Sequence, residues 1–292
     1  MRCRAACALV ATACLALAGC AATPAVPDTD RAGTASGIAA AGGLQPHDLA
    51  AGRFVLRAFA RFGRPAPPVL AVYVEGDGLA WESRTRLSAD PTPRNPLGLR
   101  LAAADPAPSV AWIARPCQYL ARLADGAGCP PAYWSEGRFA PEVVDALNRA
   151  VDGLKALAGT PRVQLIGYSG GGGLAVLMAA RRQDVASLIT VAGNLDHRAW
   201  TAHHRVTPLL ASLNPADAAA GLADLPQLHL SGAEDDVVPP AIAGLYRRQL
   251  PDTAPVALAV RPGYGHDCCW ARDWPATVAQ ARQQLAGLRG RD

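Results

Sequence analysis

The chain has 292 residues, of which 50% are hydrophobic and 18% are charged, so it is long enough to bury one large core or two small ones. Its formal net charge is +4, and the basic residues are scattered instead of forming runs with interleaved aromatic side chains. This charge pattern argues against nucleic acid as a partner.

The first twenty residues have the pattern of an export signal. A short basic start precedes an apolar run from Ala5 to Ala18 that is too short to span a bilayer comfortably. The run ends in Leu17-Ala18-Gly19-Cys20, which resembles the lipobox of bacterial lipoproteins, where the cysteine is lipidated and becomes the new N-terminus. The resemblance implies that residues 1–20 are a lipoprotein signal peptide and that Cys20 carries the lipid. A plain secretory signal and a short membrane anchor are the alternatives.

The lipobox resemblance also implies a location in the cell envelope. In bacterial lipoproteins, a residue other than Asp after the lipidated cysteine favours the outer membrane, and Ala21 holds that position here. We therefore expect a chain that is anchored to the outer membrane by its N-terminal lipid and faces the periplasm.

Residues 21–45 contain mostly Ala, Thr, Pro, Gly and Asp, with few large apolar side chains. Such a composition buries too little surface to order itself, so we expect a flexible tether here. The folded domain then occupies residues 46–292, a length that suits one α/β domain.

Short apolar runs rich in β-branched residues alternate along this domain with stretches in which apolar residues recur at helical spacing. The expected strands are 54–59, 69–74, 110–114, 163–166, 187–191, 227–230 and 256–260. The expected helices are 141–157, 171–182, 240–250 and 274–288. This alternation predicts an α/β fold, with a mostly parallel β-sheet covered by helices on both faces. In such sheets, functional sites gather at the carboxyl ends of the strands.

The motif Gly167-Tyr168-Ser169-Gly170-Gly171 fits G-x-S-x-G and lies between an expected strand and an expected helix. The strand-to-helix turn of this motif forces the serine into a strained backbone and requires small neighbours, which the flanking glycines supply. The Gly-rich run lacks the Lys and Ser/Thr of a phosphate-binding P-loop and does not fit G-x-G-x-x-G. We therefore predict that Ser169 is a nucleophile.

A nucleophilic serine needs a base and a carboxylate that orients the base, and with a G-x-S-x-G motif the acid and then the histidine follow the serine along the chain. The segment from Gly232 to Pro239 resembles the G-x-x-D-x-x-V-P acid loop of α/β-hydrolases and places the acid at Asp235. Asp236 is one residue out of register. The alternative is that either carboxylate only solvates the turn or caps the following helix.

The base is assigned to His266, which follows the last expected strand in Gly263-Tyr264-Gly265-His266-Asp267. The glycines let this loop fold back toward the sheet. Each other histidine is a weaker candidate: His229 lies inside an expected strand, His197, His203 and His204 precede the acid, and His47 adjoins the tether.

Together these blocks resemble the α/β-hydrolase superfamily. More narrowly, the segments 72–78 (VYVEGDG) and 115–119 (RPCQY) resemble those of a group of exported bacterial hydrolases. The resemblance implies that residues 46–292 form the catalytic domain, that the substrate is an acyl ester, thioester or amide, and that no cofactor is used. It also implies an oxyanion hole formed by the backbone N–H groups of Gly170 and Asp77, with Gly78 as second choice. Where such enzymes often have His-Gly-Gly-Gly, this chain has Glu75-Gly76-Asp77-Gly78. We expect the Asp77 side chain to turn away from the oxyanion.

Four cysteines follow the signal. Cys117 and Cys129 enclose a short loop and are expected to form a disulfide, which an oxidising compartment allows. The adjacent Cys268 and Cys269 have three possible states: a disulfide with each other, disulfides elsewhere, or free thiols. Neither pair has the spacing of a zinc site with nearby histidines, so no metal is expected.

The favoured function is that of a serine hydrolase, most simply a carboxylesterase that forms an acyl-enzyme with a small-molecule acyl substrate. An acyltransferase or a peptidase with the same three residues is an alternative, and a surface-tethered scaffold protein without catalysis is another. Residues 81–96 and 194–215 are candidates to shape the pocket, although core packing explains their apolar residues equally well. The sequence gives neither the acyl-chain length nor the oligomeric state.

Overall fold

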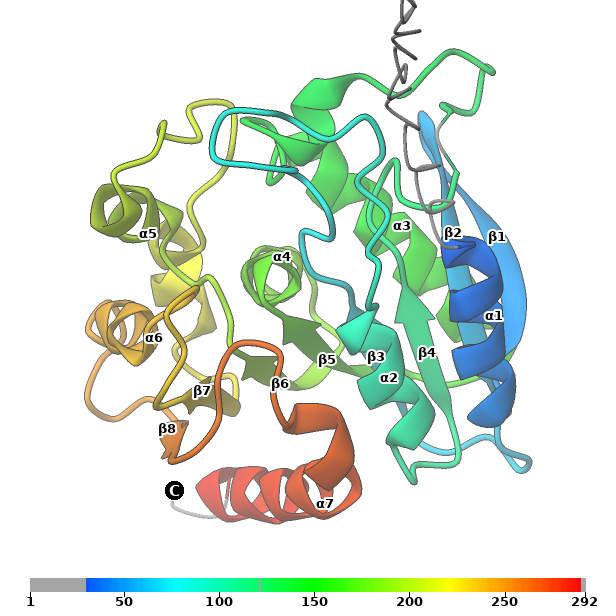
Figure 1. Cartoon of the computed structure of the whole chain (residues 1–292). Coiled ribbons are helices and arrows are strands. Elements are labelled where there is room, and N and C mark those ends of the chain that lie inside the picture. Colours follow the sequence, from blue (N-terminus) through cyan, green and yellow to red (C-terminus); the bar gives the residue numbers. More distant parts are fainter. Residues whose placement is uncertain (1–29, 121, 290–292) are drawn as a thin grey trace, which may run out of the picture.

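The computed structural model describes residues 30–120 and 122–289. Its centre is an eight-stranded sheet with the strand order β1-β2-β4-β3-β5-β6-β7-β8 (Figure 1). The strands β4, β3, β5, β6, β7 and β8 run parallel, whereas β1 and β2 pair in antiparallel fashion at one edge. The mostly parallel α/β sheet predicted from the sequence is therefore confirmed.

All the expected strands and helices form, with shifts of a few residues at their ends. The strands are β1 (Gln45–Ala51), β2 (Phe54–Arg61), β3 (Val69–Val74), β4 (Val110–Ile113), β5 (Arg162–Tyr168), β6 (Val185–Val191), β7 (Gln227–Gly232) and β8 (Val256–Arg261). The α-helices are α1 (Arg31–Ala41), α2 (Leu97–Ala104), α3 (Pro141–Ala158), α4 (Gly170–Ala179), α5 (His197–His204), α6 (Pro240–Arg247) and α7 (Trp270–Arg289). The 3-10 helices are η1 (Pro131–Trp134) and η2 (Pro215–Leu222).

Helices cover both faces of the sheet (Figure 1). Helices α3, α4 and α6 contribute to one hydrophobic cluster, and α1, α2 and α7 contribute to the other. The central strand β6 is buried along its whole length, which is why it reads as a continuous apolar run instead of an alternating one. None of the helices in the described residues combines the length and apolar character needed to cross a membrane.

The expected flexible tether over residues 21–45 is wrong for its second half, because residues 31–41 form helix α1 and β1 begins at Gln45. The helix buries Ala35 and Ala39 completely against α2, and the Asp30 carboxylate caps its N-terminus by accepting from the N–H of Gly33 at 2.8 Å. Alanine side chains let the two helices pack closely even though the segment has few large apolar residues. The low content of large apolar residues therefore led to the wrong prediction of a flexible tether. The domain therefore begins before residue 46. Cys20 and the signal lie outside the described residues.

The last helix, α7, begins at Trp270, four residues earlier than expected, and contains Pro275 within its second turn. Trp270 and Trp274 are both buried in the cluster that α7 shares with α1 and α2. Burial of these two indoles stabilises the turn before the proline, where backbone propensity alone favours a break.

Candidate active site

Ser169 occupies a sharp turn between β5 and α4. Its backbone has φ of 53° and ψ of −123°, and residues other than glycine rarely adopt a positive φ of this kind. Three backbone hydrogen bonds hold it: its N–H donates to Val191 at 2.9 Å, and its carbonyl accepts from Gly172 at 2.9 Å and Asn194 at 3.0 Å. A side chain on Gly171 would meet the carbonyl of Val74 at 2.3 Å, so only glycine lets α4 start this close to β3. The strained turn predicted from G-x-S-x-G is therefore present.

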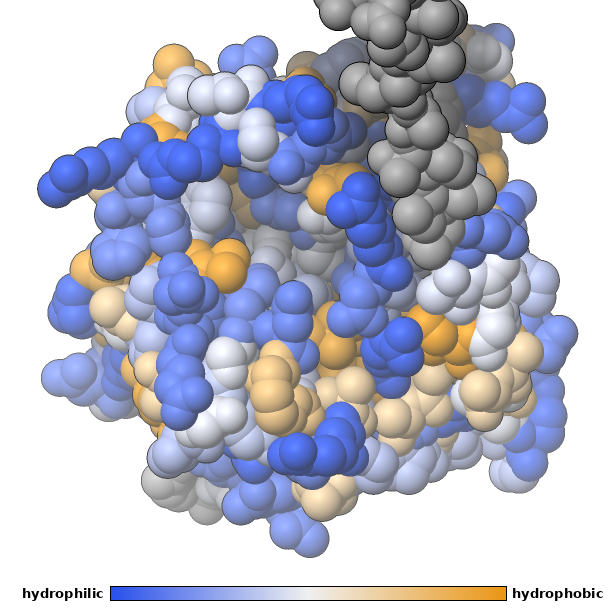
Figure 2. Space-filling model, viewed as in Figure 1, coloured by the Kyte–Doolittle hydropathy of each residue, from blue (hydrophilic) through white to orange (hydrophobic). Residues whose placement is uncertain are grey.

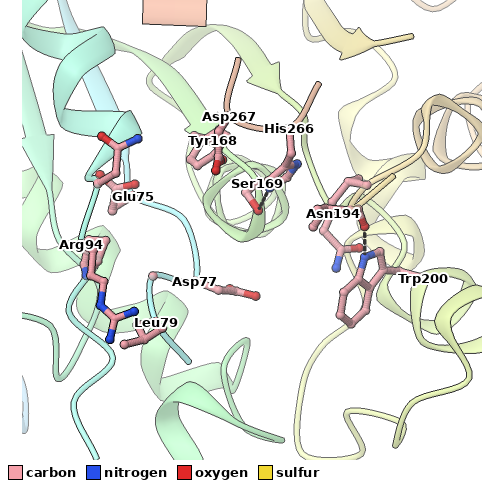
Figure 3. A pocket seen from close by; sticks show the side chains of 15 residues that line it. Glu75, Asp77, Leu79, Arg94, Tyr168, Ser169, Asn194, Trp200, His266 and Asp267 are labelled. Atoms are coloured by element: carbon pink, nitrogen blue, oxygen red, sulfur yellow. Dashed lines mark hydrogen bonds between the residues drawn. The ribbon is translucent and has the colours of Figure 1, made fainter. Parts of the chain in front are cut away.

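His266, on the loop after β8, reaches the serine. Its Nε2 lies 3.0 Å from Ser169 Oγ, and the side chains meet above the N-terminus of α4 (Figure 3). Its Nδ1 lies 2.9 Å from Asp235 Oδ2 and 3.2 Å from Oδ1. Because a carboxylate only accepts, Nδ1 carries the hydrogen and Nε2 is left to accept the hydrogen of the serine hydroxyl.

Asp235 is the carboxylate that meets the histidine, as the register of the acid loop predicts. Its side chain is fully buried, and its Oδ1 also accepts from the backbone N–H groups of Val237 at 3.0 Å and Val238 at 2.7 Å. Asp236 is exposed, and the hydrogen bonds of His266 within the described residues go to Asp235 and Ser169 instead. The loop after β7 thus uses its own backbone to fix the direction in which Asp235 faces.

The loop from Glu75 to Gly78 follows β3 and packs against the turn that holds Ser169. A Cβ on Gly76 would lie 3.3 Å from Ser169 Cβ, which shows how closely the two turns approach. Among the described residues, no hydrogen bond occupies the backbone N–H of Asp77. The N–H of Gly170 has no intrahelical acceptor because Gly170 is the first residue of α4. Both N–H groups thus lack a backbone acceptor among the described residues, and they belong to the two residues for which the sequence predicts oxyanion donors. Gly78 follows with φ of 65°.

The side chain of Asp77 points toward Arg115 and Arg138. It stays in the wall of the cavity, where Arg115 Nη1 bonds to its Oδ1 and Arg138 Nη1 bonds to its Oδ2. Burial by itself raises the pKa of this carboxyl, but the two guanidinium groups outweigh burial and lower the pKa to about 2. The negative charge of Asp77 is therefore compensated by the positive charges of Arg115 and Arg138.

Glu75 holds the same loop from behind. Its side chain is 1% exposed, and its carboxylate oxygens accept from the N–H groups of Gly76 at 2.9 Å, Gly98 at 3.2 Å and Leu99 at 3.1 Å. The indole N–H of Trp112 adds a fourth bond at 2.9 Å. Burial raises the pKa of Glu75 even though these bonds oppose the rise. The sequence singled out Glu75 as a departure from His-Gly-Gly-Gly directly after an expected strand, but did not indicate these four hydrogen bonds.

A second link that sequence reasoning missed joins the nucleophile turn to the histidine loop. Tyr168 donates from its hydroxyl to Asp267 Oδ1 at 2.6 Å, and its ring lies 5.3 Å from the ring of His266, centre to centre. Both residues stand next to a triad position in the sequence, but nothing in the local pattern shows that they meet.

A cavity of about 380 Å³ opens onto Ser169 and His266. The space-filling view shows a hollow near its centre that mostly hydrophilic residues surround (Figure 2). The apolar part of the cavity wall consists of Leu79, Pro93, Trp200, Val237 and Val238. Pro93 and Trp200 come from the two stretches singled out in the sequence, so both stretches do shape the pocket.

A neighbouring hollow of about 560 Å³ shares Trp200 with this cavity and is lined also by Trp81, Arg138 and Leu209. The indole N–H of Trp200 donates to the carbonyl of Val237 at 2.6 Å, which ties α5 to the acid loop. Trp200 therefore borders both spaces, and its side chain limits the room available next to the serine.

His229 and the four cysteines of the folded domain lie outside the Ser169–His266–Asp235 group. His229 is buried in β7 with Nδ1 2.8 Å from Thr190 Oγ1, and burial lowers its pKa to about 3, as suits a core residue. Cys117 and Cys129 form the expected disulfide, and Cys268 and Cys269 form one with each other. Across residues 30–120 and 122–289, no three His, Cys, Asp or Glu side chains gather where they could hold a metal ion.

No protein-family model matches the sequence, and no curated protein shows significant sequence similarity to it. Solved structures do match the fold. Est1E from Butyrivibrio proteoclasticus, in a structure with ferulic acid bound, aligns with a TM-score of 0.59 at 15% identity over 82% of this chain and 99% of that one. An esterase domain from a Rhodothermus marinus protein aligns at 0.56 and 15% over 83% and 99%, respectively. A lidless α/β serine hydrolase from Xanthomonas campestris aligns at 0.53 and 17% over 84% and 94%. The chain therefore has the α/β-hydrolase fold.

Proposed function

We propose that this protein is a serine hydrolase, most simply a carboxylesterase, in which Ser169, His266 and Asp235 form the catalytic triad. One observation carries the proposal: His266 Nε2 stands 3.0 Å from Ser169 Oγ while Nδ1 of the same ring stands 2.9 Å from Asp235. Three residues that are distant in sequence meet in the order that general-base activation of a serine requires.

In the proposed first step, His266 Nε2 takes the proton of the Ser169 hydroxyl as Oγ attacks the ester carbonyl carbon. The buried Asp235 carboxylate stabilises the imidazolium that forms and keeps the ring oriented. The carbonyl oxygen becomes an oxyanion, which the backbone N–H groups of Asp77 and Gly170 stabilise. His266 then returns the proton to the leaving alkoxide, and the bond between carbonyl carbon and alcohol oxygen breaks.

The acyl group is now bound to Ser169 as an ester. In the second step, His266 takes a proton from water as the water oxygen attacks the acyl carbon. A second oxyanion forms in the same hole, collapses, and releases the carboxylic acid as Ser169 Oγ recovers its proton from His266. No cofactor takes part in either step.

The size of the cavity favours acyl groups of modest length. Its volume of about 380 Å³ is near the lower end for ligand pockets, and Trp200 lines both this cavity and the adjacent hollow. We therefore infer that short-chain esters are better substrates than long-chain ones.

The first test is covalent labelling of the purified chain with a fluorophosphonate probe. Wild type should be labelled and Ser169→Ala should not, because only an activated serine attacks the phosphorus. Ser36→Ala is the matched control, since Ser36 is exposed on α1 and should leave labelling unchanged. A folded wild-type protein that remains unlabelled would contradict the proposal and favour a scaffold role.

The second test measures hydrolysis of p-nitrophenyl esters of increasing chain length, and kcat/KM should fall as the acyl chain grows.

The same assay tests the assignment of the acid. Asp235→Asn should lower kcat by about 10⁴-fold, because the amide no longer holds the productive tautomer of His266. The neighbouring variant Asp236→Asn should keep wild-type kcat, because Asp236 is exposed. Equal losses in both variants would show that the acid has been assigned wrongly.

We further propose that the chain is exported and anchored to the outer membrane through a lipid on Cys20. The support is the lipobox-like sequence before Cys20 together with the two disulfides in the folded domain, which suit an oxidising compartment. Metabolic labelling with an alkyne fatty acid should mark the wild-type chain and not Cys20→Ser. Recovery of unlabelled wild-type protein away from the membrane fraction would refute the anchor.

A further inference from the structure

We propose that Arg115 and Arg138 are positioning residues of the oxyanion hole: they bind the Asp77 carboxylate against Gly170 and leave a net positive charge beside the developing oxyanion. This inference rests on the proposed hydrolase function. It assigns a role to two arginines that lie outside the triad and outside the G-x-S-x-G motif.

The two guanidinium groups grip one carboxylate from both sides. Arg115 Nη1 bonds to Asp77 Oδ1, and Arg138 Nη1 lies 2.6 Å from Asp77 Oδ2. The arginine side chains are only 5% and 7% exposed, whereas that of Asp77 is 23% exposed toward the cavity. Buried, charge-assisted bonds of this kind are stronger than surface ion pairs and are little screened by salt.

Other contacts fix the arginines in place. Arg115 Nη2 donates to the carbonyl of Arg138 at 2.5 Å, and its guanidinium carbon lies 5.4 Å from the centre of the Phe139 ring. Arg138 Nε donates to the carbonyl of Ser135 at 2.8 Å. Neither guanidinium can swing toward solvent without losing these bonds, so Asp77 is held by a rigid frame.

Gln118 connects the same frame to the backbone of the oxyanion loop. Its Oε1 accepts from the N–H of Arg115 at 3.0 Å, and its Nε2 donates to the carbonyl of Gly76 at 3.0 Å. The carbonyl of Gly76 belongs to the peptide whose N–H is that of Asp77. Since a peptide unit is planar, holding this carbonyl also sets the direction of the Asp77 N–H.

The ionic cluster also touches the second donor residue. A Cβ added to Gly170 would lie 2.0 Å from Asp77 Oδ1 and 2.8 Å from Arg115 Nη1. The residue after the nucleophile must therefore be glycine for the cluster to occupy this position. Asp77 and Arg115 thus pack against the start of α4, and we expect this packing to keep the Asp77 loop and Gly170 in fixed register.

The charges of the cluster do not cancel. The pKa of Asp77 is about 2, so at neutral pH one carboxylate stands between two guanidinium groups, and these three side chains together carry a charge of +1. The buried Glu75 carboxyl also acts on Arg115, and burial raises the pKa of Glu75. A lone carboxylate at this place would oppose the oxyanion, whereas the cluster favours it. Fixed positive charge near the point where negative charge develops lowers the barrier without reorganisation during the reaction.

The test compares Arg138→Met with Arg182→Met in ester hydrolysis. Arg182 is a matched control, because its side chain is also 7% exposed and ion-paired, with Asp152 and Asp184. Arg138→Met should lower kcat by about tenfold to a hundredfold with little change in KM, by comparison with loss of an oxyanion donor. Arg138→Lys, which keeps the charge, should recover part of the loss. Arg182→Met should lower thermal stability and keep kcat.

The affinity for a trifluoromethyl ketone, which forms an oxyanion on Ser169, provides the second readout. Across the Arg138 variants its loss should follow the loss in kcat/KM, which a merely structural role would not produce. Arg138→Gln replaces Arg138→Met if the latter does not fold. A folded variant that is still labelled by fluorophosphonate and keeps wild-type kcat overturns the inference and leaves the proposed function intact. Failure of wild type to be labelled overturns both.

Discussion

The hydroxyl of Tyr168 donates a 2.6 Å hydrogen bond to the carboxylate of Asp267, and this bond joins the residue before Ser169 to the residue after His266. The two loops that must keep a nucleophile and a base in contact are thereby connected a second time. Burial, followed by the nearby Asp267 charge, raises the pKa of Tyr168, so its hydroxyl stays protonated and remains a donor where an ordinary tyrosine ionises.

Tyr168→Phe should therefore lower the free energy of unfolding by about 1–3 kcal/mol, the range for a hydrogen bond to a charged group, and lower kcat several-fold as the His266 loop loosens. Tyr246→Phe is the control: Tyr246 is also buried, lies on helix α6, and donates to Gln227 at 2.8 Å without a bond, within the described residues, to any triad residue or its neighbours. It should lose stability and keep kcat. Urea unfolding and ester kinetics measure both quantities, and equal kcat in the two variants would refute the link.

The disulfide between Cys268 and Cys269 follows the His266 loop directly and is reachable by reductants, since Cys268 is exposed. We expect the double change Cys268→Ser with Cys269→Ser to lower kcat several-fold and to change the melting temperature little. A bond between adjacent residues constrains almost none of the unfolded chain, so its effect is on the loop.

The other disulfide gives the contrasting case. Cys117 and Cys129 are 12 residues apart, so replacing both with serine should cost about 3 kcal/mol of stability by the loop-entropy argument. Melting curves and kcat for the two double variants separate the effects. If loss of the Cys268–Cys269 bond changes neither stability nor activity, that bond does not hold the histidine loop.

Acid should weaken the fold partly through Asp77. Its folded pKa of about 2 lies below the ordinary value for aspartate of about 3.9, so folding favours the ionised form. The resulting stability is fully present above about pH 4 and is lost as the pH falls toward 2; it amounts to about 2 kcal/mol. Asp77→Asn removes it. The difference in unfolding free energy between wild type and this variant should thus shrink from pH 7 to about pH 2.5. A difference that is constant with pH would contradict the assignment.

Trp200 should decide how long an acyl group the cavity accepts. Because it borders both the cavity of about 380 Å³ and the hollow of about 560 Å³, Trp200→Ala should join the two spaces. We expect kcat/KM for p-nitrophenyl octanoate to rise relative to that for the acetate. Trp81→Ala is the control, because Trp81 lines the hollow of about 560 Å³ but not the cavity at Ser169, and is 43% exposed. An unchanged chain-length profile in Trp200→Ala would show that the acyl group lies elsewhere.

The sequence by itself determined the strands after residue 54, the helices α3, α4, α6 and α7, and the turn that holds Ser169, whereas it did not predict helices α2 and α5. Buried parallel strands require continuous apolar runs, and the turn around Ser169 requires glycines within a few residues, so both leave a local signature. The register of the acid loop also distinguished Asp235 from Asp236 by its spacing, because Gly232 and Pro239 fix that register from nearby in the sequence.

Only the tertiary structure decided the surroundings of the site. Asp77 meets Arg115 and Arg138 across 38 and 61 residues of chain, and the bond from Tyr168 to Asp267 spans 99. Helix α1 likewise orders because α2 offers a surface that fits its alanines, which no local composition reveals. Ion pairs and close packing depend on which distant segments meet in the folded chain, and local sequence patterns do not show which segments meet.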